Sequence, residues 1–471
     1  MKKYGHAYVL LTVVCIVILI SHFVSGHGEY GRYFFWKDEA DTGMDFVNCL
    51  TEAVGGEPYS KYRSSYPPVA SSYFYALQSM LPDEVKSLVP ETHDAVVALR
   101  RTTNDLRTHQ SVLMLLILHS VLSVLLIFSA ATYKFRSYGA LPAMAIGFAA
   151  VSSYGCLSAL ERGNIVLLSA GFLMIFHLGY DSPDRQIRII SYAGLVLSAC
   201  IKLYPAIFAL MLFDGKRHVK SVIMQLSGMA LSGSVLTVAA FYLFRGLDDI
   251  PVFIRNLLRF NGGSCDDLYY RYGMRSITEH LLMELNKRLS ISISHTDTIS
   301  FVLLVATLLS LLLSLCIHLR FKDDAYQAAF DIALMAVLLQ AQSTDYTLCL
   351  FLPVLLMFIY ANPDIDLKSL SYFTILLALV LPYYTLAMSD TVNMTVHHVD
   401  IVQLTLLISV GYELVVTFSE LTSHSHHHGT WHPHHPSPIH LSLYPSGILL
   451  ETSVSKPVIL FIWKKFTWKV F

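Results

Sequence analysis

Long apolar runs recur along most of this chain and constrain its fold more than any other feature. Hydrophobic residues make up 54% of the sequence and charged residues only 14%, against roughly 25% charged residues in a soluble domain. An α-helix needs about 20 mostly apolar residues to cross a bilayer. Runs near this length follow one another at 111–132, 139–159, 165–180, 219–243, 299–318, 325–341, 346–361, 369–388 and 400–419. The sequence therefore predicts an all-α polytopic membrane protein, not a soluble globule, a disordered chain or a coiled coil.

The N-terminus supplies a further apolar run. Lys2 and Lys3 precede it, and it extends from Ala7 to about Val24. A cleaved signal peptide has a shorter apolar core, so we expect a retained anchor that forms the first span.

One apolar stretch is interrupted. Ile187 to Phe213 contains the sequence Lys202-Leu203-Tyr204-Pro205, and a proline removes a backbone donor from a helix. We expect a broken or re-entrant pair of short helices here. With this pair, the chain has about 12 membrane segments.

The basic residues of the short loops fall on one side of this topology. Alternating the spans from a cytoplasmic N-terminus places inside Lys134, Arg136, Arg185, Arg188, Lys216, Arg217, Lys220, Arg320, Lys322 and Lys368. Cytoplasmic loops carry the excess of Lys and Arg, so both termini are expected in the cytoplasm of a plasma-membrane protein. The net charge of −1 gives no support for nucleic-acid binding.

Two long polar loops then lie outside, at 25–109 and 245–297. Polar irregular backbone cannot sit in lipid, so we expect external helices that lie on the membrane surface. The sequence predicts a transmembrane domain over 1–420 and a cytoplasmic tail over 421–471.

Carboxylates gather soon after the first span. They include Asp41 and Asp45, which could supply a general base or hold a divalent cation. The alternative is an acidic loop that is only solvated. No specific metal signature is present.

Two basic positions lie at the external ends of apolar runs. Arg162 and Asn164 stand in a short turn, and an arginine fork suits a phosphate; the turn alone is the alternative. Lys202 in an apolar run is costly unless it has a function or reaches water, and Tyr204 follows it. A lysine that extends to the interface is the alternative.

The second external loop and a later turn offer further polar groups. Asn261 and Ser264 lie in a Gly-rich segment that precedes Tyr269-Tyr270-Arg271-Tyr272, and Asp345 and Tyr346 follow an apolar run. Cys49 and Cys265 both fall in external loops, where a disulfide between them stays an open alternative.

The C-terminal tail is rich in histidine. Its histidines are His424, His426, His427, His428, His432, His434, His435 and His440. Such tracts bind metals by composition, but they have no fixed ligand spacing here, and we favour a dispensable tail. No metal or other cofactor is expected for activity.

Taken in order, these motifs resemble the GT-C membrane glycosyltransferases, and within them glycosyltransferase family 87, which includes polyprenyl-phosphomannose-dependent mannosyltransferases. The resemblance covers roughly residues 1–420. It rests on Asp45-Phe46, Gly56 to Tyr59, Tyr66-Pro67-Pro68, Arg162-Gly163-Asn164, Lys202 to Pro205, Asn261 to Ser264 and Asp345-Tyr346.

The resemblance implies a GT-C-like fold and an inverting transfer of a hexose such as mannose on the external face. The partners would be a polyprenyl-phosphate-linked sugar, a glycan or glycolipid acceptor, and the bilayer. Asp45, with Asp41 second, would be the catalytic base. The donor phosphate would be bound by Arg162, Lys202, Asn164 and Tyr204. The remaining substrate contacts would come from Tyr66, Asn261, Ser264, Asp345 and Tyr346.

Two other functions remain as alternatives. A secondary transporter would use Lys202 and the broken helices as a midplane site, but the chain shows no internal repeat of the kind that many transporters have. An O-antigen polymerase or ligase would rely on a large external loop late in the chain.

Overall fold

A computed structural model describes residues 43–89, 106, 109–214, 217–262, 271–289, 295–321, 325–340, 343–361, 367–380, 386–387, 395–396 and 398–427. The predicted first span at 7–24 lies outside these residues. The chain divides into two compact units, Met1–Glu420 and Leu421–Phe471. The description below concerns the first unit.

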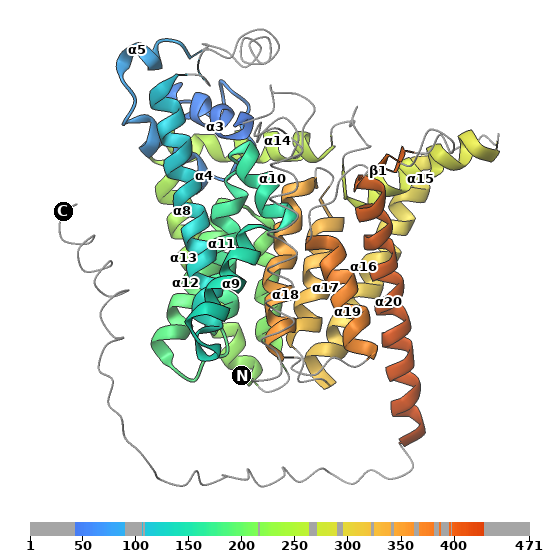
Figure 1. The fold of residues 1–471 in the computed structure, drawn as a ribbon. Coiled ribbons are helices and arrows are strands. Elements are labelled where there is room, and N and C mark those ends of the chain that lie inside the picture. The colour runs from blue at the N-terminus through green and yellow to red at the C-terminus, as the bar shows by residue number, and fades with distance from the viewer. Residues whose placement is uncertain are drawn as a thin grey trace, which may run out of the picture. The chain divides into compact units, whose positions relative to one another are not determined.

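The first unit is built of helices (Figure 1). Three of the described helices are long and apolar enough to cross a bilayer: α8 (Gln110–Lys134), α13 (Val219–Phe241) and α16 (Thr296–Phe321). Only 6% of the apolar stretch of α13 is buried within the protein, as expected of a helix whose sides face lipid. The protein is a helical membrane protein.

The other apolar elements are shorter, except α20 (His398–His427), in which only Val402–Thr417 is a continuous apolar stretch. They are α11 (Val166–Gly179), α12 (Arg185–Ile201), η3 (Tyr204–Phe213), α17 (Ala325–Leu338), η6 (Asp345–Leu350), α18 (Phe351–Ala361), α19 (Leu367–Val380) and α20. Among the described residues three helices qualify as spans, or four if a bent pair counts as one. The count of about 12 membrane segments therefore stays a prediction.

The bent pair is α9 (Ala140–Val151) and α10 (Tyr154–Arg162), which meet at 58°. The span predicted at 139–159 is therefore not one straight helix but two helices joined at a bend. The helix α9 ends at Val151, and α10 packs closely on η6. A Cβ on Gly155 would lie 2.4 Å from the backbone nitrogen of Cys349, so only glycine allows this approach.

The interrupted stretch at Lys202 forms a hairpin. The helix α12 ends at Ile201, Lys202 is extended at φ −138° and ψ 128°, and η3 follows. After η3, Arg217 donates hydrogen bonds to the Tyr180 carbonyl and the Tyr192 hydroxyl, at 3.0 and 3.1 Å. Because these partners lie where α11 ends and α12 begins, the chain has returned to the end from which α12 started.

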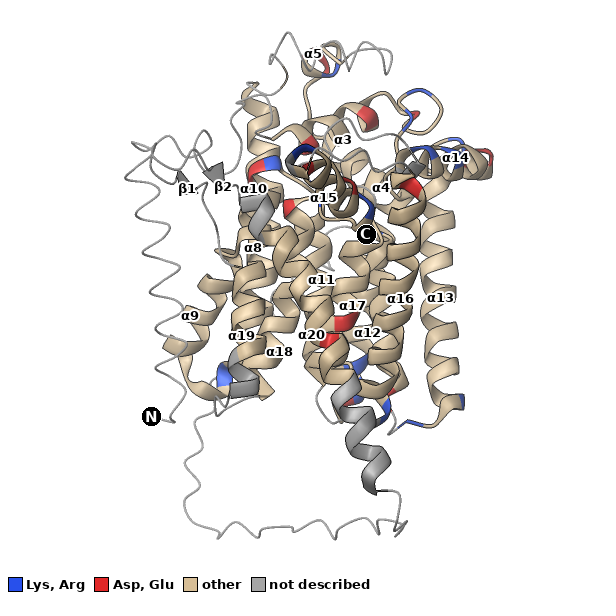
Figure 2. Cartoon of the chain, turned by 90° about the vertical axis from the view of Figure 1, so that its right-hand side faces the viewer, with Lys and Arg blue, Asp and Glu red and all other residues tan. Residues whose placement is uncertain are grey.

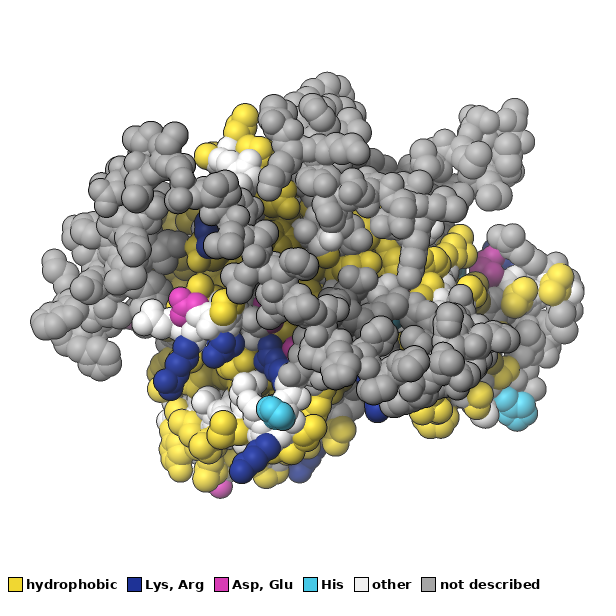
Figure 3. Space-filling model, turned by 90° about the horizontal axis from the view of Figure 1, so that it is seen from below, with side chains coloured by type: hydrophobic (Ala, Val, Ile, Leu, Met, Phe, Trp, Pro, Cys, Tyr) yellow, Lys and Arg dark blue, Asp and Glu magenta, His cyan; other side chains and the backbone are white. Residues whose placement is uncertain are grey.

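The helices of this unit have two distinct ends. At the lower end in Figure 1, α8 ends and α12 begins. Basic side chains of this lower end include Lys134, Arg136, Arg185, Arg188, Arg217, Lys220 and Arg320. Figure 2 marks Lys and Arg residues there, below a helix layer that carries few charges, and Figure 3 shows their side chains from below.

The upper end carries helices from the two long polar loops. They are α3 (Met44–Val54), α4 (Pro68–Gln78), α5 (Asp83–Lys86), α14 (Asp249–Gly262) and α15 (Met274–Leu289). Four small elements complete the list outside the helix layer. They are η2 (Arg136–Tyr138), η4 (Gly246–Asp248) and the two-residue strands β1 (Leu386–Ala387) and β2 (Thr395–Val396), which pair antiparallel.

The upper helices have a core of their own. Phe46 of α3 and Phe74 of α4 are 0% and 1% exposed, and their rings meet edge to face at 5.5 Å. Burying a phenylalanine contributes about 1.5–3 kcal/mol. Asn256 of α14 donates to the carbonyls of Tyr59 and Ser64, which ties the second polar loop to the first. This packing fixes α3, the helix that carries Asp45.

Candidate active site

Asp45 lies in the first turn of α3, against the end of α10. The helix starts after Gly43, whose φ of 67° favours glycine and whose backbone nitrogen donates to the Glu161 carbonyl at 2.8 Å. This bond places the start of α3 beside Arg162. The Arg162 guanidinium donates two hydrogen bonds to the Asp45 carboxylate, from Nε to Oδ2 at 2.8 Å and from Nη2 to Oδ1 at 2.7 Å. Such a bidentate pair fixes the orientation of the carboxylate.

Gly163 lets the chain present two donors to this carboxylate. It ends α10 in the left-handed region, at φ 62°, and a Cβ there would lie 2.6 Å from the Cβ of Phe46. Directly after this turn, Asn164 donates from Nδ2 to Asp45 Oδ2 at 2.7 Å. Its Oδ1 accepts the backbone N–H of Val166 at 2.9 Å, so the amide is held at both of its atoms.

The electrostatics of Asp45 follow from these contacts. The side chains of Arg162 and Asp45 are only 17% and 12% exposed. Burial alone would raise the pKa of Asp45. The charge and hydrogen bonds of Arg162, the hydrogen bond of Asn164 and the charge of Lys202 outweigh it and hold the pKa of Asp45 below its usual value. Asp45 is therefore an oriented, ionised carboxylate.

Lys202 faces the same region from the break between α12 and η3. Its Nζ lies 4.1 Å from the centre of the Tyr66 ring, within the range of a cation–π contact. Burial raises the pKa of Tyr66 well above its usual value, so the ring stays neutral. Among the residues that the structure describes, no carboxylate forms an ion pair with Lys202.

The start of η6 contributes two further residues, Asp345 and Tyr346, to the surroundings of the site. Tyr346 interacts electrostatically with Asp45, Arg162 and Arg271. Its neighbour Asp345 is 2% exposed and accepts a hydrogen bond from the Tyr272 hydroxyl. Asp345 is thus a buried acceptor that positions the loop, while Tyr346 lies close enough to Asp45 to interact with its charge.

Arg271 is a functional candidate that the sequence analysis did not select. Its carbonyl accepts from Gln403 at 2.8 Å, and the next backbone nitrogen donates to Ser343 at 2.9 Å. Within the described part of the chain, its buried Nη1 has no hydrogen-bond partner, and neither does the buried Tyr204 hydroxyl. The run of aromatic residues around Arg271 was the available signal.

Several predicted site residues are not placed by the structure. Asp41 and Ser264 lie outside the described residues, and so does Cys265. Asn261 belongs to the last turn of α14, but its side chain is not described. Cys49 is a buried free thiol.

The structure therefore brings together residues that are far apart in the sequence. Asp45 and Arg162 are separated by 117 positions. The residues that bond to Asp45 or interact with its charge are Tyr66, Arg162, Asn164, Lys202 and Tyr346, and Arg271 interacts in turn with Tyr346. The arrangement offers one fixed carboxylate beside cationic and phenolic donors, which is the chemistry needed to take a proton from one reactant and to bind an anionic group of another.

Comparison with known proteins gives one family. The family model described as Glycosyltransferase family 87 matches residues 106–353. None of the curated proteins that were compared with the chain matches it. The matched stretch includes Arg162, Asn164, Lys202, Arg271 and Tyr346, whereas Asp45 and Tyr66 precede it.

Proposed function

Because the chain belongs to glycosyltransferase family 87, we propose that it transfers a sugar from a polyprenyl-phosphate donor to a glycan or glycolipid acceptor at the membrane. The transfer is inverting and moves a hexose such as mannose. The observation that carries this proposal is the meeting of Asp45 with Arg162, Asn164 and Lys202 at one end of apolar helices.

Asp45 acts as the general base. Its Oδ2 accepts from Arg162 and Asn164, whereas Oδ1 accepts from Arg162. A carboxylate oxygen has room for two donors, so Oδ1 can accept the hydroxyl of the sugar acceptor. The hydroxyl oxygen of the acceptor attacks the anomeric carbon of the donor sugar, while the bond from this carbon to the phosphate oxygen breaks. The proton passes to Asp45, and the electron pair leaves with the polyprenyl phosphate.

The donor phosphate binds to Lys202, Tyr204 and Arg271. This assignment differs from the expectation for Arg162 and Asn164, because both of these donate to Asp45 in the structure. The Nη1 of Arg271 and the Tyr204 hydroxyl are buried donors that find no acceptor among the described residues. Positive charge at the leaving phosphate stabilises the transition state. The proposed step uses side chains alone and includes no metal or cofactor.

The site faces the outside of the plasma membrane. The lower end of the helices carries the basic residues of the short loops, and the positive-inside rule favours a cytoplasmic position for that end. Asp45 lies at the opposite end. A lipid-linked donor suits this location, because each buried CH₂ of its chain contributes about 0.8 kcal/mol to membrane attachment.

The identity of the donor can be tested in a transfer assay with purified protein in detergent. The protein should transfer hexose from a polyprenyl-phosphate sugar, and transfer from a nucleotide sugar without any lipid carrier would overturn the proposal. Lys202→Met should raise the KM for the donor more than the KM for the acceptor. Lys134→Met is the matched control, since Lys134 also stacks on a tyrosine, 4.5 Å from the centre of the Tyr360 ring, but at the lower end.

Asp45→Asn tests the base. We expect a folded protein whose kcat is lower by about 10²–10⁴-fold, the usual contribution of a general base. Near-normal turnover of Asp45→Asn would assign the base to another group.

A further inference from the structure

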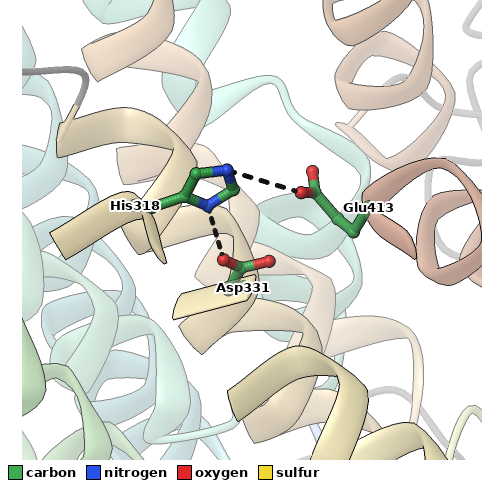
Figure 4. Close-up of side chains that lie close together, drawn as sticks. All are labelled: His318, Asp331 and Glu413. Carbon is green, nitrogen blue, oxygen red and sulfur yellow. Dashed lines mark hydrogen bonds and ion pairs between the residues drawn. The ribbon is translucent and has the colours of Figure 1, made fainter. Parts of the chain in front are cut away.

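Three titratable side chains meet inside the helix layer, away from Asp45. They are His318 of α16, Asp331 of α17 and Glu413 of α20, and their side chains are at most 1% exposed. In Figure 4 the imidazole lies between the two carboxylates. His318 Nδ1 is 2.8 Å from Asp331 Oδ2, and Nε2 is 4.0 Å from Glu413 Oε2. We call these three residues the buried triad.

Hydroxyl groups support both carboxylates of the buried triad. Ser314 Oγ lies 3.1 Å from Asp331 Oδ2 and 3.3 Å from Glu413 Oε2, and the Tyr372 hydroxyl donates to Glu413 Oε1. These contacts hold the carboxylates as acceptors. Burying an ionised carboxylate in an apolar interior is unfavourable unless a cation compensates its charge. Two carboxylates that flank one imidazole thus form a site for positive charge.

Two further polar side chains lie next to the buried triad. Gln327 is one helical turn from Asp331 on the same face of α17, and Thr417 is one turn from Glu413 on α20. They are 0% and 2% exposed. Neither amide atom of Gln327 nor the Thr417 hydroxyl has a hydrogen-bond partner in the described part of the chain. Buried polar atoms are nearly always paired, so these groups point to a ligand or its waters.

Gln327 and Thr417 also lie on one side of the buried triad. The helix α17 begins at the lower end, and α20 runs from Gln403, which bonds to the Arg271 carbonyl at the upper end, toward the lower end. Both residues are therefore displaced from the triad toward the lower end. The two side chains whose polar atoms lack partners among the described residues are thus on the same side of the triad.

We propose that His318, Asp331 and Glu413 bind a divalent transition-metal ion, with Zn²⁺ as the ion to test first. One ligand atom from each residue lies within 4.8 Å of the others. Ligand bonds to zinc are about 2.0–2.2 Å long, so small side-chain movements bring all three atoms around one ion. An imidazole nitrogen with carboxylate oxygens suits such ions, whereas Mg²⁺ and Ca²⁺ take oxygen ligands. Gln327 supplies a further oxygen.

The metal ion would join three helices. The ligands come from α16, α17 and α20, and no residue of the buried triad takes part in the proposed sugar transfer. Asp331 lies seven residues before the end of α17 at Leu338, which is about 10 Å along a helix, and the loop to Tyr346 follows only then. The ion would therefore fix α17, which leads to η6, and α20, whose Gln403 donates to the Arg271 carbonyl, without contacting the donor.

The experiment uses the full-length chain, purified through a tag without histidine. The eight histidines of the tail, from His424 to His440, are replaced by glutamine so that they do not bind metal themselves. After treatment with a chelator and dialysis against Zn²⁺, we expect one bound zinc per chain by elemental analysis. Asp331→Asn and Glu413→Gln should each weaken zinc binding by about tenfold or more.

His280→Gln is the matched control. It removes another buried histidine, which interacts with Gln403 at 2.9 Å and lies outside the buried triad, and it should keep the zinc. A second measurement needs no triad variant: zinc should raise the unfolding temperature of the tail-substituted protein, and Mg²⁺ should not. Less than stoichiometric zinc, equal zinc affinity after Asp331→Asn, or an unfolding temperature that zinc does not change would show that the triad is only an ion-pair network.

Discussion

At the residue scale, the pairing with Arg162 determines the orientation and the ionisation of the Asp45 carboxylate. A solvated acidic loop, which was the alternative on the sequence, would leave Asp45 exposed and its pKa ordinary. Instead the carboxylate is 12% exposed and bonded to Arg162 and Asn164. An ion pair this enclosed is costly to break from one side, because the remaining charge is left uncompensated. A substitution of Arg162 therefore also changes the environment of Asp45, the base that Arg162 orients.

Arg162→Gln should shift the pH dependence of activity. The substitution removes the charge and the bonds that lower the pKa of Asp45 but leaves the burial that raises it, so this pKa rises. A base works only when it is deprotonated. The acidic limb of the kcat/KM profile should therefore move to higher pH, measured as initial transfer rates across a pH series.

Arg136→Gln provides the comparison for that profile. Arg136 lies at the lower end and donates to the Tyr133 carbonyl at 2.9 Å, so its loss should leave the acidic limb in place. An unchanged limb in Arg162→Gln as well would mean that Asp45 is not the group that titrates. The same lowered pKa affects stability. The contribution of the ion pair to the free energy of unfolding is present above the usual pKa of Asp45, and it is lost as the pH falls through the lowered pKa.

At the scale of elements, the turn between α10 and α11 decides whether the site assembles. Gly163→Ala places a Cβ at φ 62°, 2.6 Å from the Cβ of Phe46 and 2.7 Å from Leu116. Strain of this kind costs about 1–3 kcal/mol. We expect a lower unfolding temperature in detergent together with lower transfer activity, because Arg162 and Asn164 flank the turn.

Gly228→Ala is the matched substitution. Gly228 lies inside α13, and a Cβ there meets nothing within 4 Å. Alanine is favoured over glycine in a helix by about 0.8–1.0 kcal/mol, so this variant should be as stable as the parent or more stable. If Gly163→Ala behaved in the same way, the positive φ would not be required.

The sequence predicted long helices better than it predicted the site. The bounds of α8, α13 and α16 agree with the apolar runs within a few residues, because the length of an apolar run determines where a span can begin and end. The bend after Val151 was not predicted, and the close approach of Gly155 to the Cys349 backbone beyond it is a contact between distant residues that no local pattern shows. Arg271 was passed over because its environment depends on the distant Gln403 and Tyr346.

At the scale of the whole molecule, the distribution of charge gives a testable orientation. Lys61→Cys lies in the polar loop at the upper end, and Lys220→Cys lies at the start of α13, at the lower end. An impermeant maleimide should label Lys61→Cys in intact cells and label Lys220→Cys only after the membrane is opened. The reverse pattern would place the site in the cytoplasm, where a soluble donor could reach it.

The hairpin of α12 and η3 determines at which end of the helix layer the following segments emerge. A segment that enters the helix layer and returns to the same end adds an even number of passages. Had residues 187–213 formed one straight helix, the segments after it would emerge at the other end, and Tyr346 could not lie near Asp45. A local interruption at Lys202 therefore determines on which side the later half of the site is assembled.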